Sequence, residues 1–296
     1  MRILVTGGSG MLGRALVRRL SAGHRVSAVS KSGGGGAAVA ACDLTDARQT
    51  ARLFVEPPEM VIHTAAYSDV DGCERDPRLA YAANALAVRN LAGECRRLRV
   101  PLVHVSTDYV FDGRKASPYE TDDPVFPINV YGLTKLHGEH FARTSPVHAV
   151  VRTSWLFGPG NEKNFVNAVL ECLRKLGAAD VLDDQEDAPT YVEDLSEALE
   201  RIAVHLAGEA AAGREAAHTF HVCNRGSATR LAMTRRMNEV LGLGARVGRA
   251  QTGQVAGRAA MRPRYVVMSP RRYEEFFGCA MRPWEESLAD YLKSLR

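Results

Sequence analysis

The feature that most constrains the fold stands at the start of the chain, where a short apolar run leads directly into closely spaced glycines. Residues 2–6 predict a buried strand, and an amphipathic helix is expected to begin at Met11. The glycines of the intervening turn are Gly7, Gly10 and Gly13. Such a turn lets the backbone approach a phosphate, which the free N–H groups and positive dipole end of the following helix can bind. The order strand, glycine turn, helix predicts a dinucleotide-binding βαβ unit.

The first half of the chain alternates apolar runs with helical patterns. Strands are expected at 2–6, 25–30, 60–64, 102–106 and 149–153, and helices at 11–21, 47–54, 77–98 and 130–144. Most of the strand runs are continuously apolar, as parallel strands buried on both faces require. The alternation predicts an α/β fold built on a doubly wound Rossmann parallel sheet.

The second half has a less regular pattern, which indicates a smaller C-terminal substrate-binding lobe. Further helices are expected at 164–176, 192–205, 229–241 and 284–295. We predict a dinucleotide-binding Rossmann domain over 1–155, to which 190–224 returns, a substrate-binding lobe from 156–189 and 225–283, and a C-terminal helix at 284–296.

Composition narrows the classes of protein. The 296 residues carry a net charge of +4 and six cysteines, with no CxxC pair. Neither a zinc site nor another metal site is expected. The arginines are scattered, so no nucleic-acid partner is expected. The first residues lack the layout of a signal peptide, and no apolar run reaches the length of about 18 residues that spans a membrane. We therefore expect a cytoplasmic protein with no membrane partner.

The end of the second strand predicts which cofactor is bound. An acidic residue there would bind the ribose 2′-hydroxyl of NAD, but this chain has Ser30, Lys31 and Ser32. A cation between two hydroxyls suits a 2′-phosphate, so NADP(H) is the preferred cofactor, with NAD(H) left open. The glycines at 33–36 predict a flexible loop. After the third strand, Asp43 and Leu44 are candidates for the adenine edge.

A YxxxK motif predicts the reaction. Tyr131 and Lys135 are four residues apart in an expected helix, so their side chains share one face. A lysine cation favours the phenolate and is expected to lower the tyrosine pKa, which suits proton exchange with a carbonyl oxygen. Thr107, at the end of the expected strand 102–106, is placed where open α/β sheets bind their ligands.

These motifs give the chain a specific resemblance. It resembles the extended short-chain dehydrogenases/reductases, and within them the dTDP-4-dehydrorhamnose reductase family. The matching segments, in order, are VTGGSGMLG, HTAAYSDVDGCERDP, NALAVRNLA, HVSTDYVFDG, YGLTKLHGE, RTSWLFG, NF at 164–165 and DDQEDAPT. The resemblance implies a reductase that transfers hydride from NADPH to the 4-keto carbon of a nucleotide-linked 4-keto-6-deoxysugar.

The resemblance also implies roles for individual residues. Thr107, Tyr131 and Lys135 would carry catalysis. The cofactor would be held by Gly7, Gly10, Met11, Leu12, Gly13, Ser30, Lys31, Asp43, Leu44, Ala65, Ala66, Tyr67, Tyr131 and Lys135. The substrate would be held by Val70, Thr107, Asp108, Trp155, Asn164, Pro189, Thr190 and Arg262.

Two departures from the family pattern concern the substrate. The pattern DQxGxPT has Asp187 in place of its glycine, and RPxxSxLD survives only as Arg262-Pro263. Either Asp187 faces the nucleotide diphosphate, in which case Arg262 or Arg264 would offset its charge, or it points to solvent in a turn.

Two other kinds of function stay open. One is another chemistry on the same fold, a 4,6-dehydratase or an epimerase, although the Glu that dehydratases place after the strand-end Thr-Asp pair is replaced by Tyr109. The other is a non-catalytic NADP-binding subunit that resembles the regulatory β subunit of methionine adenosyltransferase. A homodimer is also left open.

Overall fold

A single parallel sheet forms the centre of the molecule. The computed structural model describes residues 1–34, 39–161, 164–250 and 257–295, so the predicted loop at 33–36 lies partly outside the described residues. The seven strands are, in spatial order, β11 (Ala216–His221), β6 (Val147–Thr153), β5 (Leu102–Thr107), β4 (Met60–His63), β1 (Arg2–Thr6), β2 (Arg25–Ser30) and β3 (Val39–Ala41). All neighbouring strands pair in parallel. The order reverses between β1 and β4, which confirms the predicted doubly wound fold.

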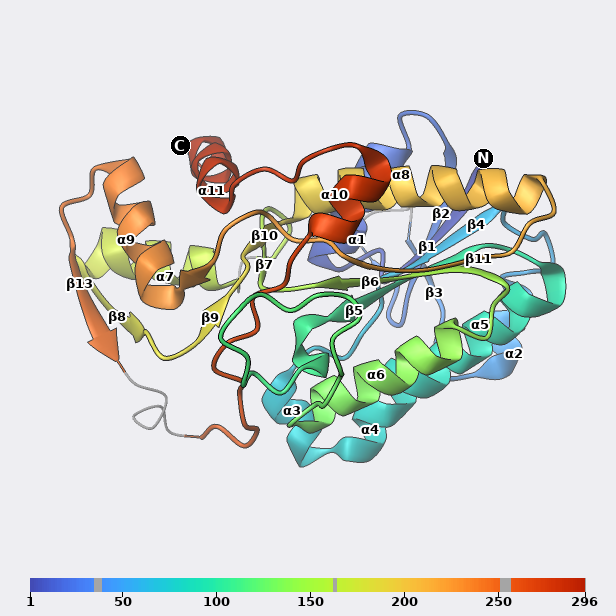
Figure 1. Ribbon diagram of the computed structural model, residues 1–296, viewed down its shortest axis with the longest axis horizontal. Coiled ribbons are helices and arrows are strands. Elements are labelled where there is room, and N and C mark those ends of the chain that lie inside the picture. Colours follow the sequence, from blue (N-terminus) through green and yellow to red (C-terminus); the bar gives the residue numbers. More distant parts are fainter. Residues whose placement is uncertain (35–38, 162–163, 251–256, 296) are drawn as a thin grey trace.

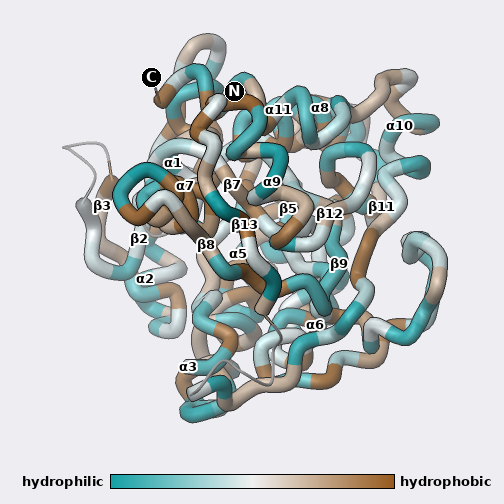
Figure 2. The backbone as a smooth tube through the Cα atoms, turned by 90° about the vertical axis from the view of Figure 1, so that its left-hand side faces the viewer, coloured by the Kyte–Doolittle hydropathy of each residue, from teal (hydrophilic) through white to brown (hydrophobic). Residues whose placement is uncertain are grey.

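Helices cover both faces of this sheet (Figure 1). One face packs against α1 (Met11–Leu20) and α8 (Val192–Ala211), whose leucines form a core with β1, β4, β5 and β6. The other face carries α2 (Ala47–Arg52), α3 (Val70–Arg75), α4 (Pro77–Tyr81), α5 (Ala87–Leu98) and α6 (Val130–Ala142). In Figure 2 teal and brown stretches alternate along the tubes of the helices, as helices with one buried face require.

The helix expected at 77–98 is interrupted by a π-helical turn, η1 (Ala82–Leu86), between α4 and α5. The turn carries Asn84, which is fully buried. Its side chain accepts a hydrogen bond from the Tyr67 amide (2.8 Å) and donates to the Thr134 hydroxyl (3.2 Å). The irregular turn therefore ties the loop after β4 to α6, the helix of the YxxxK motif.

The second part of the chain builds a lobe beside the sheet. Its core lies between α7 (Phe165–Leu176), α9 (Arg230–Leu241) and α11 (Trp284–Ser294), next to the paired strands β8 (Ala178–Leu182) and β13 (Arg246–Ala250). Two short ladders lead into this lobe: β7 (Leu156–Phe157) with β10 (Thr190–Tyr191), and β9 (Glu186–Asp187) with β12 (Ala228–Thr229). A short helix, α10 (Arg271–Phe277), packs against β11. Figure 1 shows the lobe at the left of the sheet.

A buried ion pair joins α6 to the sheet. Arg152 on β6 donates two hydrogen bonds, of 2.9 Å each, to the two carboxylate oxygens of Glu139 on α6. Both side chains are almost completely buried, and the Ser106 hydroxyl donates to the same carboxylate at 2.7 Å. Two-point pairing fixes the position of α6 along β5 and β6.

We predict that Glu139→Gln lowers the free energy of unfolding by about 3–5 kcal/mol, because it leaves the Arg152 charge buried without a counter-ion. Urea denaturation followed by circular dichroism measures the change. Glu94→Gln is the matched control, since Glu94 pairs with Arg97 at the surface of α5 and the loss should stay below about 1 kcal/mol. Equal stability losses in the two variants would contradict a structural role for the buried pair.

Candidate active site

A cavity of about 650 Å³ opens at the carboxyl edge of the sheet, between the sheet and the lobe. The predicted site residues that line it are Gly7, Gly10, Met11, Leu12, Gly13, Ser30, Lys31, Ala65, Ala66, Val70, Thr107, Asp108, Tyr131, Lys135 and Trp155. Residues that the sequence did not single out for it include Ser9, Thr64, Ser154, Asn161 and Arg230. Polar groups from both halves of the chain therefore meet in one cavity.

One end of the cavity fits a dinucleotide phosphate. Helix α1 begins after Gly10, and no side chain caps its first N–H groups. A Cβ added at Gly13 would lie 2.1 Å from the carbonyl oxygen of Gly7, so only glycine permits this close contact between turn and helix. The start of α1 lines the cavity, and an anion is the partner that uncapped N–H groups at a helix start bind best.

Lys31 lies at the rim of this end. Its side chain is 71% exposed, and its ammonium is 3.2 Å from the Asp43 carboxylate. The hydroxyl and amide of Thr45 also hold that carboxylate and lower the pKa of Asp43. An exposed ion pair contributes less than about 1 kcal/mol, so Lys31 can exchange Asp43 for a ligand phosphate.

Three of the predicted cofactor residues do not line the cavity. Asp43 lies outside it, in the ion pair with Lys31. Leu44 is buried in the core under α5, and its carbonyl accepts from Asn90 (3.0 Å). Tyr67 is held by Asn84. Their roles toward the cofactor stay predictions.

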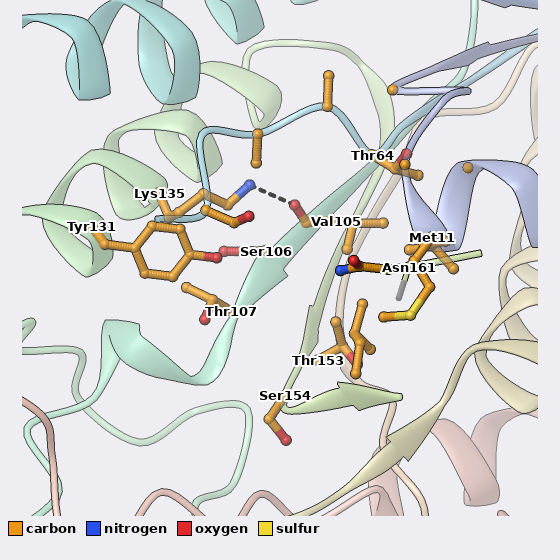
Figure 3. Close-up of a pocket in the computed structure, with 18 of the residues that line it drawn as sticks. Met11, Thr64, Val105, Ser106, Thr107, Tyr131, Lys135, Thr153, Ser154 and Asn161 are labelled. Carbon is orange, nitrogen blue, oxygen red and sulfur yellow. Dashed lines mark hydrogen bonds between the residues drawn. The ribbon is translucent and has the colours of Figure 1, made fainter. Parts of the chain in front are cut away.

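The YxxxK motif and the strand-end threonine meet in the cavity. Tyr131 and Lys135 lie on α6 and Thr107 ends β5, and Figure 3 shows the three side chains grouped around the end of that strand. The Tyr131 and Thr107 side chains both line the cavity. A Cβ added at Gly132 would lie 2.0 Å from the Tyr109 carbonyl oxygen, so glycine lets α6 start directly against the chain that follows β5.

Burial acts in opposite directions on Tyr131 and Lys135. Burial lowers the pKa of Lys135 to about 8, and its ammonium donates to the Val105 carbonyl at 2.7 Å. Burial raises the pKa of Tyr131, whereas the motif led us to expect that Lys135 would lower it. The phenol is therefore protonated at neutral pH and placed to donate a proton.

The substrate-binding residues that the family resemblance implied fall into two groups, those that line the cavity and those that do not. Val70, Thr107, Asp108 and Trp155 line the cavity. Trp155 has a φ of 39°, a conformation that is costly for a large side chain and that is often found at functional sites.

The other four do not line the cavity. Asn164 caps α7 and donates to the Gly158 and Asn161 carbonyls. Pro189 and Thr190 are buried beside β7. Arg262 pairs with Asp71 at 2.8 Å.

Sequence reasoning missed Arg230, the first residue of α9. Its guanidinium lies 5.3 Å from the ring of Trp155 and 4.9 Å from that of Phe165, and its Nε atom is buried without a hydrogen-bond partner among the described residues. Burial lowers its pKa, yet it lines the cavity as a cation. A positive residue in the first turn of a helix opposes the helix dipole, which was the available signal.

The same cavity contains Asp187. Its carboxyl faces the cavity beside Asp108, so the alternative in which it points to solvent is wrong. Within the described part of the chain, no group of three or more His, Cys, Asp or Glu side chains is arranged to hold a metal ion. In the same ranges, no helix combines the length and apolar character needed to cross a membrane.

A Rossmann sheet with a phosphate-binding glycine turn beside a Tyr, Lys and Thr group defines an NAD(P)-dependent oxidoreductase of the extended short-chain type. The chain matches the model of the RmlD substrate binding domain over residues 1–296, and it belongs to that family. Curated relatives include the dTDP-4-dehydrorhamnose reductase of Mycolicibacterium smegmatis, 37% identical over 98% of this chain and 84% of the relative. Another is the spore coat polysaccharide biosynthesis protein SpsK of Bacillus subtilis, 34% identical over 99% and 97%.

Solved structures give the same relationship. A dTDP-4-dehydrorhamnose reductase from Clostridium acetobutylicum aligns with a TM-score of 0.88 at 31% identity and covers 100% of this chain and 99% of its own. The Bacillus anthracis enzyme, in complex with NADP, aligns with a TM-score of 0.88 at 30% identity over 99% of both chains. The predicted family is confirmed.

We predict that Lys31→Ala weakens NADPH binding by about tenfold and leaves NADH binding nearly unchanged, because only the 2′-phosphate gains from the lysine cation. Fluorescence titration with each cofactor measures both constants. Lys175→Ala, an exposed lysine paired with Glu171 on α7, removes the same charge away from the cavity and should alter neither. An unchanged preference in Lys31→Ala would exclude Lys31 as the basis of selectivity.

Proposed function

We propose that this protein is an NADPH-dependent reductase of a nucleotide-linked 4-keto-6-deoxysugar, with an activity like that named for its dTDP-4-dehydrorhamnose reductase relatives. The observation that carries the proposal is the meeting of Thr107, Tyr131 and Lys135 in a cavity that also contains the glycine turn. Incubation with a dTDP-4-keto-6-deoxysugar and NADPH tests it, with loss of reduced cofactor as the readout. No loss on any 4-keto-6-deoxysugar nucleotide would favour the alternative of a non-catalytic subunit.

The chemistry assigns one role to each side chain. When bound, NADPH supplies the hydride. Tyr131 donates its proton to the carbonyl oxygen, which its raised pKa permits because the phenol stays protonated. Lys135 is held by the Val105 carbonyl on the same helix face as Tyr131, and its cation stabilises the phenolate left after the transfer. Thr107, which lines the same cavity as Tyr131, orients the carbonyl oxygen.

The substrate's diphosphate needs a cation in the lobe. We propose Arg230 for this role, because it lines the cavity and its Nε has no partner among the described residues. Arg262, the residue expected from the sequence, donates to both oxygens of Asp71 at 3.2 and 2.8 Å. The cation–π contact with Trp155 restrains the Arg230 guanidinium, whose planar fork suits two-point binding of phosphate.

A cytoplasmic location is part of the proposal. All six cysteines are free thiols, and four of them are buried. Free thiols persist in a reducing compartment. The homodimer that the sequence left open stays a prediction, which light scattering on the purified protein tests.

We predict that Tyr131→Phe lowers turnover by about 10²–10⁴, because only the transferable proton is lost. NADPH affinity should change little. Stopped-flow measurement of hydride transfer and fluorescence titration of NADPH separate the two effects. Turnover close to that of the unmodified protein would remove Tyr131 from its assigned role.

We predict that Arg230→Ala raises KM for the sugar nucleotide by about ten- to hundredfold with kcat little changed, the signature of lost uniform binding. Arg236→Ala, on the same helix and paired with Glu239 at the surface, is the matched control. Arg262→Ala is measured in parallel. If only Arg262→Ala raises KM, Arg262 rather than Arg230 binds the diphosphate.

A further inference from the structure

Two carboxyls face each other in the part of the cavity next to the catalytic threonine. Asp108 follows Thr107 directly and is only 3% exposed, and Asp187 lines the same cavity from β9 in the lobe ladder. The Asp108 Oδ1 atom accepts a hydrogen bond from the Thr107 hydroxyl at 2.8 Å. The Asp108 Oδ2 atom is buried without a donor among the described residues. The Asp187 side chain lines the same cavity, and its negative charge raises the pKa of Asp108.

Asp108 is buried and Asp187 is half-buried, and two carboxylates in one desolvated part of a cavity repel each other strongly. This arrangement favours either a cation between them or a proton on one of them. No described group of side chains there is arranged as a metal site. A proton on one carboxyl supplies the donor that the buried Asp108 Oδ2 atom lacks. The arrangement of Asp108 and Asp187 involves no residue of the glycine turn or of the YxxxK motif.

The charged and titratable groups around the pair come from five segments. Arg230 on α9 is the cation that faces Asp187. Facing Asp108 are the phenols of Tyr109 and, from α6, Tyr131, together with the Cys223 thiol after β11. Arg262, on the segment after β13, acts on Tyr109 and Arg230 and is itself paired with Asp71. One cation facing two carboxyls favours a single negative charge on the pair.

The pair is connected to the catalytic group through Thr107. The Thr107 hydroxyl accepts from the Tyr109 amide at 3.2 Å and has one proton, which it donates to Asp108. A fully ionised pair would hold that proton more tightly and keep it from the substrate oxygen. It would also add negative charge beside an oxygen that becomes more negative as hydride arrives. A proton shared within the pair weakens both effects.

We propose that Asp187 is a positioning residue that shares one proton with Asp108, and that loss of this proton withdraws the Thr107 hydroxyl from the substrate carbonyl and stops the reduction. The proposal rests on the proposed reductase function. Asp187 stands where the family pattern has glycine, so we expect the shared proton only in this chain and in relatives with an acidic residue at this position. Burial is consistent with it, because it raises the pKa of Asp108 well above the usual range and that of Asp187 to about 6.

The first test needs no substrate. The chemical shifts of the carboxyl carbons of ¹³C-labelled aspartate are followed by NMR in the free protein from about pH 4 to about pH 9. We expect two aspartates that titrate together in two steps, with the upper step above about pH 6. Asp187→Asn should abolish the upper step, because its amide donates to Asp108 at every pH. Two carboxyls that are both ionised at pH values below about 6 would overturn the proposal, whatever the protein's activity.

The second test is the pH profile of kcat/KM. In the wild type, kcat/KM should fall by about tenfold for each pH unit above the upper ionisation, because one proton is lost. Lys135, with its pKa lowered to about 8, could cause a fall in the same range, and only the variant separates the two origins. In Asp187→Asn the fall assigned to the pair should disappear, whereas Asp183→Asn, in the same segment and paired with Arg249, should keep the wild-type profile.

The outcomes of the two tests are distinguishable. An unchanged profile in Asp187→Asn would overturn the positioning role, and the fall would then belong to Lys135. If NMR shows the shared proton but the protein has no reductase activity, the proposed function is contradicted. The shared proton between Asp108 and Asp187 would still stand. If Asp187→Asn fails to fold, Asp187→Gly replaces it in both tests, and the wild-type NMR titration decides the shared proton by itself.

Discussion

The ion pair between Glu139 and Arg152 is the interaction on which the geometry of the site depends. It joins α6 to β6 through two hydrogen bonds of 2.9 Å, in surroundings where neither charge reaches water. Glu139 lies one helical turn beyond Lys135, and its carboxylate also accepts from Ser106, the neighbour of Thr107 on β5. The position of the YxxxK face relative to the end of β5 is therefore set by a pair whose separation would leave a buried charge without a partner.

Burial then sets the protonation states that the chemistry uses. A desolvated phenol is harder to ionise and a desolvated ammonium is easier to deprotonate, so the same enclosure shifts Tyr131 and Lys135 in opposite directions. At neutral pH the phenol holds its proton and the lysine is largely cationic. This is the starting state that the proposed reduction requires, in which Tyr131 would donate a proton and the Lys135 cation would stabilise the phenolate.

The lobe differs from the sheet in how its charges are used. Arg262 forms an ion pair with Asp71 of α3, so its charge is neutralised within the protein. Arg230 contacts only the rings of Trp155 and Phe165 among the described cation–π pairs, and its guanidinium lines the cavity. Asp187 brings a negative charge into the same region, beside Asp108. The substrate half of the cavity thus contains the Arg230 cation and the carboxyls of Asp108 and Asp187.

The sequence by itself determined what depends on local spacing: the strand, glycine turn and first helix, the parallel sheet of continuously apolar strands, and Tyr131 and Lys135 on one helix face. These follow from fixed helical and strand periods, which hold wherever the segment lies. Tertiary structure alone decided that Arg230 rather than Arg262 lines the cavity, and that Asp43 pairs with Lys31. It also decided that Asn164 caps α7, and that Asp187 lines the same cavity as Asp108. The reason is that these contacts join segments distant in sequence, and their partners and degree of burial exist only once the sheet and lobe have packed against each other.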